Sequence, residues 1–327
     1  MLMHPYLYLF YLFLMFAIFL IISANSWFVA WVGLEMNVIS FIPLMLSKNN
    51  KYSNESSLKY FLTRAFASIF IISSALFMSC GYLTTGYLLL SALFLKAGGA
   101  PFHQWLPSLV EGLSWSSLMV IFILQKVSPL LLVSFLLLDE MGFVLGYLVI
   151  VTSAMIGSIG GLMSISLRKI MAYSSISHMS WVVSSMFISN FTWVGYYGVY
   201  CLVLFCVLNV FKKESVFSLN QMMLSSKSTR LIMSLGLLSL GGLPPFSGFV
   251  PKFMVSIMLL QNNNYFIFII LLSSTFLSLF FYVRMTLIGL ILSSGVTVFL
   301  KESHLTKSGV TLNIMGLLVP GLFFLML

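Results

Sequence analysis

Long apolar segments recur along almost the whole chain, and they constrain its fold more than any other feature. A helix needs about 20 mainly apolar residues to cross the hydrocarbon core of a membrane. The connections between such segments are short, so we expect an all-α, polytopic membrane protein in which residues 1–327 form a single integral membrane domain. About eleven windows are long and apolar enough, at roughly 5–23, 27–46, 58–80, 85–108, 115–138, 142–164, 170–188, 191–211, 231–257, 265–290 and 309–327.

The composition excludes an ordinary water-soluble domain. Only 7% of the residues are charged, whereas soluble domains carry about a quarter. The N-terminal stretch lacks the basic start and the small-residue cleavage site of a signal peptide, so we expect it to remain as the first spanning helix. It also lacks the Arg-rich pattern of a transit peptide. A mitochondrial protein with this N-terminus would be made inside the organelle.

The basic residues indicate an orientation in the membrane. If the N-terminus lies on one side, the loops and helix ends of that side hold most lysines and arginines, whereas the opposite loops hold none but carry Asp139 and Glu140. Loops rich in lysine and arginine favour the inner side of a membrane, so we expect the N-terminus on the inner side. The basic residues on its side are Lys48, Lys51, Lys59, Arg168, Lys169, Lys212, Lys213, Lys227, Arg230, Arg284, Lys301 and Lys307.

Motifs for a resident cofactor are missing from the sequence. It has no Walker loop, no Rossmann glycine fingerprint and no cysteine cluster for an iron–sulfur centre. Cys80, Cys201 and Cys206 lie in apolar runs without zinc or redox spacing, so we interpret them as packing residues. The basic residues do not gather in a groove, so nucleic acid is not an expected partner. We expect no cofactor and no metal in this chain.

Apart from Lys59 and Arg284 near window ends, five charged residues fall inside the apolar windows, where each costs at least about 2.5–3.5 kcal/mol at the helix centre. An ionisable group at this depth should face a partner or water, which makes it a candidate functional residue. These residues are Glu35, Arg64, Lys96, Lys126 and Lys252.

A structural explanation competes with a functional one for these charges. Arg64 is close enough to the basic side to extend its side chain there, and this is the favoured explanation for it; Lys252 could do the same. Glu35, Lys96 and Lys126 lie too deep, and a structural ion pair is the alternative for them. One acid cannot pair with three lysines, so that alternative leaves at least two lysines unexplained.

Lysine suits proton transfer because it can lose its proton when desolvated, whereas arginine stays charged. Lys96, Lys126 and Lys252, together with Glu35, would therefore form a lateral proton relay along the membrane midplane. His178, in the segment SSISHMSW, is a candidate intermediate, and a packing histidine is the alternative.

Two windows contain similar interruptions. The segments KAGGAPFHQWLP and GGLPPFSGFVPK both read Gly-Gly-x-Pro, then Phe and a second Pro, with a lysine at one end. Such breaks are tolerated in a membrane where they are buried in protein or line a wet cavity. A pair of broken helices in two halves of a chain is typical of inverted-repeat transporters with a midplane ion site. We therefore expect inverted repeats with two discontinuous helices.

Six segments, in order and at consistent spacing, carry a family resemblance. They are similar to segments of the chain 2 family of mitochondrial NADH-ubiquinone oxidoreductases, and most of all to arthropod members. The resemblance extends from about Asn25 to Lys252. The segments read NSWFVAWVGLEMNVISFIPL, SSLKYFLTRAFAS, FLKAGGAPFHQWLPSLVEGLSW, LQKVSPLLL, SLRKIMAYSSISHMSWV and LSLGGLPPFSGFVPKF.

This resemblance implies an antiporter-like membrane-arm subunit of respiratory complex I, in the mitochondrial inner membrane with its N-terminus in the matrix. Repeats at about 27–138 and 142–290 would precede a C-terminal helix at 309–327. Such a subunit would carry protons, while other subunits use NADH, FMN, iron–sulfur clusters and ubiquinone. Its expected partners are the other membrane-arm subunits and membrane lipid, with cardiolipin as a candidate. The alternatives are a stand-alone cation/proton antiporter and a non-pumping structural subunit.

The resemblance also implies roles for individual residues. By motif position, Glu35 matches the family's conserved glutamate and Lys126 its central lysine, while Lys96 and Lys252 match the lysines of the two broken helices. In that family, pairing of the glutamate with a lysine is proposed to gate proton movement. Arg64 is a departure, because family members often carry a neutral polar residue there.

Overall fold

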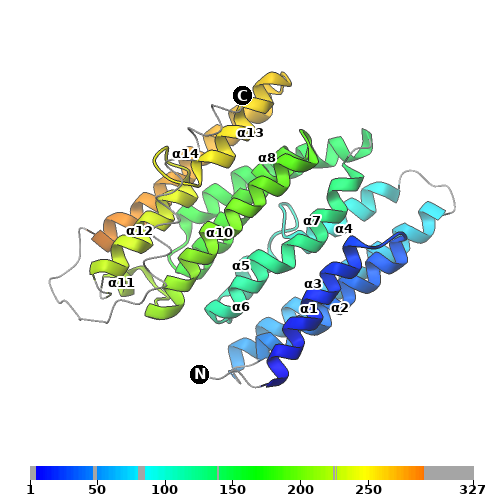
Figure 1. The fold of residues 1–327 in the computed structure, drawn as a ribbon, viewed down its shortest axis with the longest axis horizontal. Helices are drawn as coiled ribbons and strands as arrows, with labels where there is room; N and C mark the ends of the chain where they lie inside the picture. Colours follow the sequence, from blue (N-terminus) through cyan, green and yellow to red (C-terminus); the bar gives the residue numbers. More distant parts are fainter. Residues whose placement is uncertain are drawn as a thin grey trace. The chain divides into compact units, whose positions relative to one another are not determined.

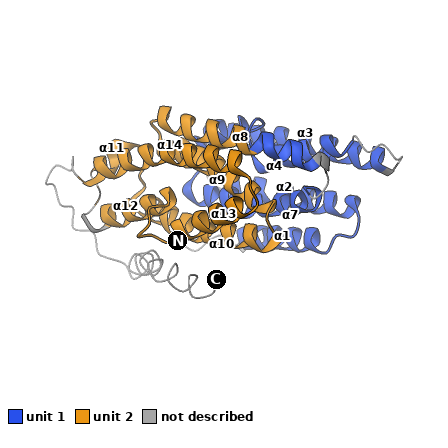
Figure 2. Cartoon of the chain, turned by 90° about the horizontal axis from the view of Figure 1, so that it is seen from above, with its two compact units in different colours: residues 1–149 blue, residues 150–327 orange. Residues whose placement is uncertain are grey.

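The computed structural model describes two compact units. They comprise residues 1–149 and 150–327, hereafter the first and second unit (Figure 2). The part of the chain that is described covers residues 5–46, 50–79, 85–137, 140–223, 225 and 227–290. Within these ranges the secondary structure is helical and contains no strand, apart from an isolated bridge between Ser166 and Ser218. The predicted all-α class is confirmed.

The first unit is built from neighbouring helices in which α1, α2 and α3 lie side by side, and α4 packs against both α3 and α7 (Figure 1). Helix α8 (Glu140–Met163) contains the boundary between the two units, which falls between residues 149 and 150. The helices before α8 are α1 (Pro5–Ile22), α2 (Trp27–Leu46), α3 (Lys51–Ser79), α4 (Gly86–Ala97), α5 (Trp105–Val110), α6 (Trp115–Met119), the π-helical turn η2 (Val120–Leu124) and α7 (Gln125–Leu136).

The second unit contains the remaining helices, among which α12 packs against α10 and α14. Its centre includes α9, whose serines donate hydrogen bonds to carbonyls of the preceding turn, for example Ser174 to Met171 at 2.8 Å. These local bonds satisfy the buried hydroxyls of a helix that is mostly buried. The helices are α9 (Leu167–Met186), α10 (Asn190–Glu214), α11 (Leu219–Met222), α12 (Lys227–Gly241), α13 (Phe249–Gln261) and α14 (Tyr265–Leu290).

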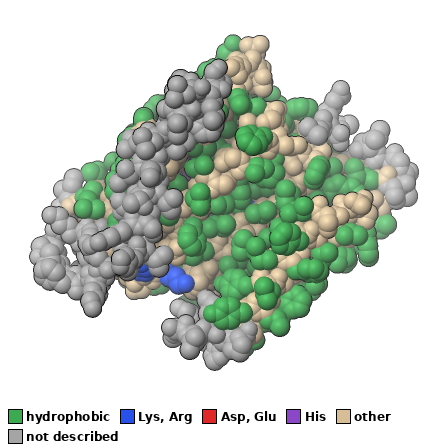
Figure 3. Space-filling view, in the orientation of Figure 1, with side chains coloured by type: hydrophobic (Ala, Val, Ile, Leu, Met, Phe, Trp, Pro, Cys, Tyr) green, Lys and Arg blue, Asp and Glu red, His purple; other side chains and the backbone are tan. Residues whose placement is uncertain are grey.

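Six helices among the described residues are long and apolar enough to cross a membrane by length and composition. On the face shown in Figure 3, hydrophobic side chains cover most of the described surface, as expected for a surface in contact with lipid. The six are Trp27–Leu46, Lys51–Met78, Trp115–Leu136, Gly142–Met163, Asn190–Glu214 and Tyr265–Leu290.

The helix boundaries differ from the predicted windows mainly at polar ends. Helix α3 begins at Lys51, so Lys51 and Lys59, which we expected in a loop, are helical. An exposed ion pair between Lys59 and Glu55, at 2.6 Å and helical spacing, supports this polar start, which a search for apolar residues cannot detect. The predicted features outside the described residues are Lys48, Cys80, Asp139, Lys301, Lys307 and the C-terminal helix at 309–327.

Candidate functional site

The first helix break begins where α4 ends at Gly98. This residue has φ +77°, a left-handed conformation that glycine adopts without a steric penalty. The Gly98 N–H donates to the carbonyls of Phe94 and Leu95, and the Gly99 N–H also donates to Phe94. The chain then runs irregularly through residues 98–104 before α5 starts. The glycine therefore ends the helix with its last carbonyls partly satisfied.

A tryptophan closes this break from the other side. The Trp105 indole N–H, at the start of α5, donates to the Leu95 carbonyl at 3.0 Å. Because an indole is a permanent donor, this bond fixes the broken segment against the end of α4.

The second break has the same backbone design. Gly242 has φ +82°, and its N–H donates to the carbonyls of Leu238 and Ser239. Residues 242–248 are irregular, and α13 follows. Gly98 and Gly242 are therefore the equivalent residues of the two breaks. The shared pattern Gly-Gly-x-Pro matches Gly98 with Gly241 instead, because the sequence does not reveal which of two adjacent glycines has a positive φ.

Lys96 lies at the last turn of α4, and its side chain is 1% exposed. Its ammonium is 3.4 Å from the Glu35 carboxylate of α2, whose side chain is 25% exposed. This distance is longer than the 2.7–2.9 Å of a strong charge-assisted hydrogen bond. The structure thus brings together two of the predicted residues in a loose pair. The lysine side chain of this pair is buried, and the glutamate side chain is partly exposed.

Lys252 lies on α13, just beyond the second break, and is buried. Its ammonium donates to the carbonyls of Gly241 at 2.8 Å and Leu240 at 3.2 Å. The alternative that Lys252 extends toward the membrane surface is therefore wrong. The carbonyl groups at the end of α12 attract the Lys252 ammonium and keep it buried.

Lys126 is buried on α7, directly after the π-helical turn. The residue before it, Gln125, belongs to a buried hydrogen-bond chain across three helices. Tyr60 donates to Gln125 at 2.8 Å, Gln125 to Asn37 at 2.9 Å, and Asn37 to Ser128 at 3.0 Å. These hydrogen bonds hold α2 and α3 against α7. The network was not predicted from the sequence, although polar residues within apolar windows were a usable signal.

Arg64 does not extend to the membrane surface, so the favoured explanation for it was wrong. Its side chain is buried on α3, with the guanidinium carbon 5.0 Å from the Tyr60 ring centroid and 4.9 Å from that of Trp105. Aromatic faces attract a cation without the need for an acid, which explains why it stays inside.

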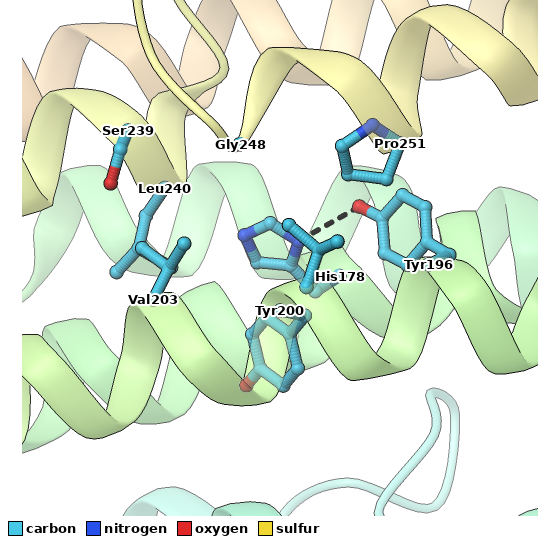
Figure 4. Close-up of a pocket in the computed structure, with 9 residues that line it drawn as sticks. His178, Tyr196, Tyr200, Val203, Ser239, Leu240, Gly248 and Pro251 are labelled. Atoms are coloured by element: carbon cyan, nitrogen blue, oxygen red, sulfur yellow. Dashed lines mark hydrogen bonds between the residues drawn. The ribbon is translucent and has the colours of Figure 1, made fainter. Parts of the chain in front are cut away.

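His178 lines a small cavity beside the second break (Figure 4). Its Nδ1 is 2.9 Å from the Tyr196 hydroxyl of α10, and its ring lies 4.7 Å from that of Tyr200. Helix α12 contributes Ser239 and Leu240 to the cavity wall, and the second break contributes Gly248. The arrangement places a titratable side chain next to the interrupted helix of the second unit.

Metal ligands do not gather anywhere in the part of the chain that is described, where no group of three His, Cys, Asp or Glu residues is close enough to hold an ion. The site is therefore a set of buried charges, hydrogen-bond donors and interrupted backbone.

Comparison with known proteins identifies the family. The family described as NADH:quinone oxidoreductase/Mrp antiporter, TM, matches residues 24–80 and 74–278. A relative named NADH-ubiquinone oxidoreductase chain 2, from Anopheles gambiae, is 41% identical over 292 residues, which cover 85% of this chain and 84% of the relative. The protein of the same name from Aedes aegypti is 37% identical, with 94% of each chain covered. The chain belongs to the NADH-ubiquinone oxidoreductase chain 2 family.

Solved structures extend the likeness of this chain 2 family member at the level of the fold. A chain of respiratory complex I from Thermus thermophilus superposes with a TM-score of 0.80 at 23% identity, covering 97% of this chain and 78% of that one. A chain of the Mrp complex from Dietzia gives 0.78 at 17% identity, covering 90% and 62%. The predicted family and the antiporter-like membrane fold are confirmed. Membership in the chain 2 family supports the predicted proton-translocating membrane-arm subunit.

Proposed function

We propose that this chain is a membrane-arm subunit of the proton-translocating NADH:ubiquinone oxidoreductase. It moves protons across the mitochondrial inner membrane, with its N-terminus in the matrix. Other subunits hold the flavin, iron–sulfur clusters and ubiquinone and pass electrons from NADH, so no redox step takes place in this chain. The observation that carries the proposal is the buried Lys96 at a helix break, loosely paired with Glu35.

The loose pair suits a lysine that gains and loses a proton. A tight, fully buried pair would resist proton loss, because the remaining carboxylate would be left without its partner. Here the Glu35 side chain is one quarter exposed, so it can turn toward water or another cation when Lys96 is neutral.

Lys126 and Lys252 continue the relay beyond this pair. Lys252 can also lose its proton and keep both contacts, although each becomes weaker, because a neutral amine retains two N–H groups for its two carbonyl acceptors, Leu240 and Gly241. His178 is the intermediate that we assign to the second unit, since it lies beside the same break.

Replacing Tyr196 by phenylalanine tests the role of His178. The change removes the hydroxyl that meets His178 Nδ1 and keeps the ring, so we expect NADH-driven proton translocation to slow several-fold in the assembled complex. Tyr200→Phe is the matched control, because its buried hydroxyl has no hydrogen-bond partner in the part of the chain that is described. Equal rates in the two variants would contradict a relay through His178.

A native gel tests the assembly of this chain into the larger enzyme. Membranes are extracted with mild detergent, the gel is stained for NADH dehydrogenase activity, and the chain is located by mass spectrometry. We expect it in the large active band, together with other membrane-arm subunits and lipid, of which cardiolipin is the candidate. Migration alone or in a small inactive oligomer would favour a stand-alone antiporter, which the Mrp-like fold keeps as the second candidate.

A further inference from the structure

Arg64 is a buried cation that the proposed relay does not use. Its side chain is 3% exposed and lies in the spanning part of α3. Arginine stays protonated in proteins, so this charge is permanent. The ion pairs found among the described residues join Lys59 to Glu55 and Lys96 to Glu35, and neither includes Arg64.

Two aromatic rings hold Arg64 in place. The guanidinium lies about equally close to the rings of Tyr60 and Trp105, at 5.0 and 4.9 Å, and these rings meet edge-on at 6.3 Å. The Nε atom of Arg64 has no hydrogen-bond partner among the described residues. The charge is therefore stabilised by two aromatic faces and a hydrogen bond to Tyr60, and the ion pairs of the described residues do not include it.

One of these rings borders the Lys96 site, and the other is linked to a neighbouring hydrogen-bond network. Trp105 donates to the carbonyl of Leu95, the residue before Lys96, and Tyr60 starts the hydrogen-bond chain that passes through Gln125. Charge interactions connect the groups directly: Glu35 attracts both Arg64 and Lys96, and the two cations repel each other. Arg64 is thus an electrostatic neighbour of the proton-carrying pair.

We propose that Arg64 is the fixed countercharge of this site, which balances Glu35 whenever Lys96 releases its proton. With Lys96 protonated, the three groups carry a net charge of +1. After release, Glu35 and Arg64 leave the site neutral. Without Arg64, release would leave Glu35 with no cation beside it and the site with a net charge of −1, so proton release from Lys96 would be less favourable. Arg64 therefore acts as a positioning residue for the Lys96 proton.

The surrounding elements carry further titratable groups. Helix α2 contributes Glu35, α3 contributes Tyr60, α4 contributes Lys96, α7 contributes Lys126, and the break between α4 and α5 contributes His103. The hydroxyl of Tyr60 donates to Gln125. The inference rests on the proposed function, since it concerns the proton that Lys96 carries.

The test measures the pH profile of NADH-driven proton translocation by the assembled complex in sealed membranes. In Arg64→Gln the repulsion that eases proton release from Lys96 is lost. We expect the pH optimum to rise by about one unit, which corresponds to a tenfold higher proton affinity. Arg64→Lys keeps a cation at this position as long as the lysine is protonated, so its profile should lie between the original one and that of Arg64→Gln. Lys59→Gln, which removes an exposed charge from the same helix, should leave the profile unchanged.

The outcomes separate this inference from the proposed function. An unshifted profile in an assembled Arg64→Gln complex, or a larger shift in Arg64→Lys than in Arg64→Gln, would overturn the proposal that Arg64 is the countercharge. Failure of both variants to assemble would overturn it as well, since Arg64 would then serve folding. If Lys96→Met translocates protons normally, the proposed function itself fails, whatever the Arg64 variants show.

Discussion

Replacement of Lys96 by methionine is expected to reduce proton translocation by at least tenfold while the complex still assembles. Methionine keeps an unbranched side chain of similar length in the buried position, but it cannot bind a proton. The Glu35 side chain is one quarter exposed, so the carboxylate that loses its partner is not enclosed within the unit and need not destabilise the fold. Translocation is measured as NADH-driven proton uptake by sealed inner-membrane vesicles, and assembly by native gel.

The exposed pair on α3 provides the control for this experiment. Lys59→Met makes the same chemical change in a lysine that also contacts a glutamate, but at an exposed position. Exposed pairs contribute little, so this variant should match the unmodified complex. An assembled Lys96→Met complex with full translocation would show that the Glu35–Lys96 pair is structural, and a non-pumping subunit would become the better description.

Gly242→Ala is expected to impair both stability and translocation. A residue with a Cβ in the left-handed conformation costs about 1–2 kcal/mol. The added atom would also lie 2.8 Å from Cδ and 3.1 Å from Nζ of Lys252, so the lysine side chain must shift relative to its two carbonyl acceptors. We expect a lower melting temperature of the assembled subunit and a several-fold loss of proton uptake.

A second glycine in the same unit serves as control. A Cβ added to Gly195, within α10, would meet no heavy atom of a neighbouring helix within 4 Å among the described residues, so Gly195→Ala should be neutral or slightly stabilising. If Gly242 acts through Lys252, the double variant Gly242→Ala/Lys252→Met should translocate no worse than Lys252→Met alone. Additive losses would show that the break itself, and not the lysine position, is what the glycine protects.

Hydropathy was sufficient to predict the helices and the breaks within the described residues. The apolar windows have the length that a bilayer requires, and the Gly-Pro segments interrupt them where α4 and α12 end. Hydropathy could not predict the helical start of α3, because residues such as Lys51 and Lys59 are polar and their helix is stabilised by local pairs.

The partners of the buried charges were harder to predict. Glu35 and Lys96 are 61 residues apart in the sequence, and only the packing of α2 near α4 brings their side chains to 3.4 Å. For Arg64, a rule based on side-chain length favoured the membrane surface. The rule failed because it ignores aromatic faces, which Tyr60 and Trp105 provide inside the unit.

The different donors that close the two breaks give them different mechanical properties. The indole N–H of Trp105 does not titrate, so its hydrogen bond to the Leu95 carbonyl holds the first break equally firmly in every protonation state of the site. The second is closed by Lys252, and charge-assisted hydrogen bonds are roughly twice as strong as neutral ones. Loss of one proton would therefore loosen the second break and leave the first unchanged, so a proton carried by Lys252, as we propose, would also change how firmly that break is closed.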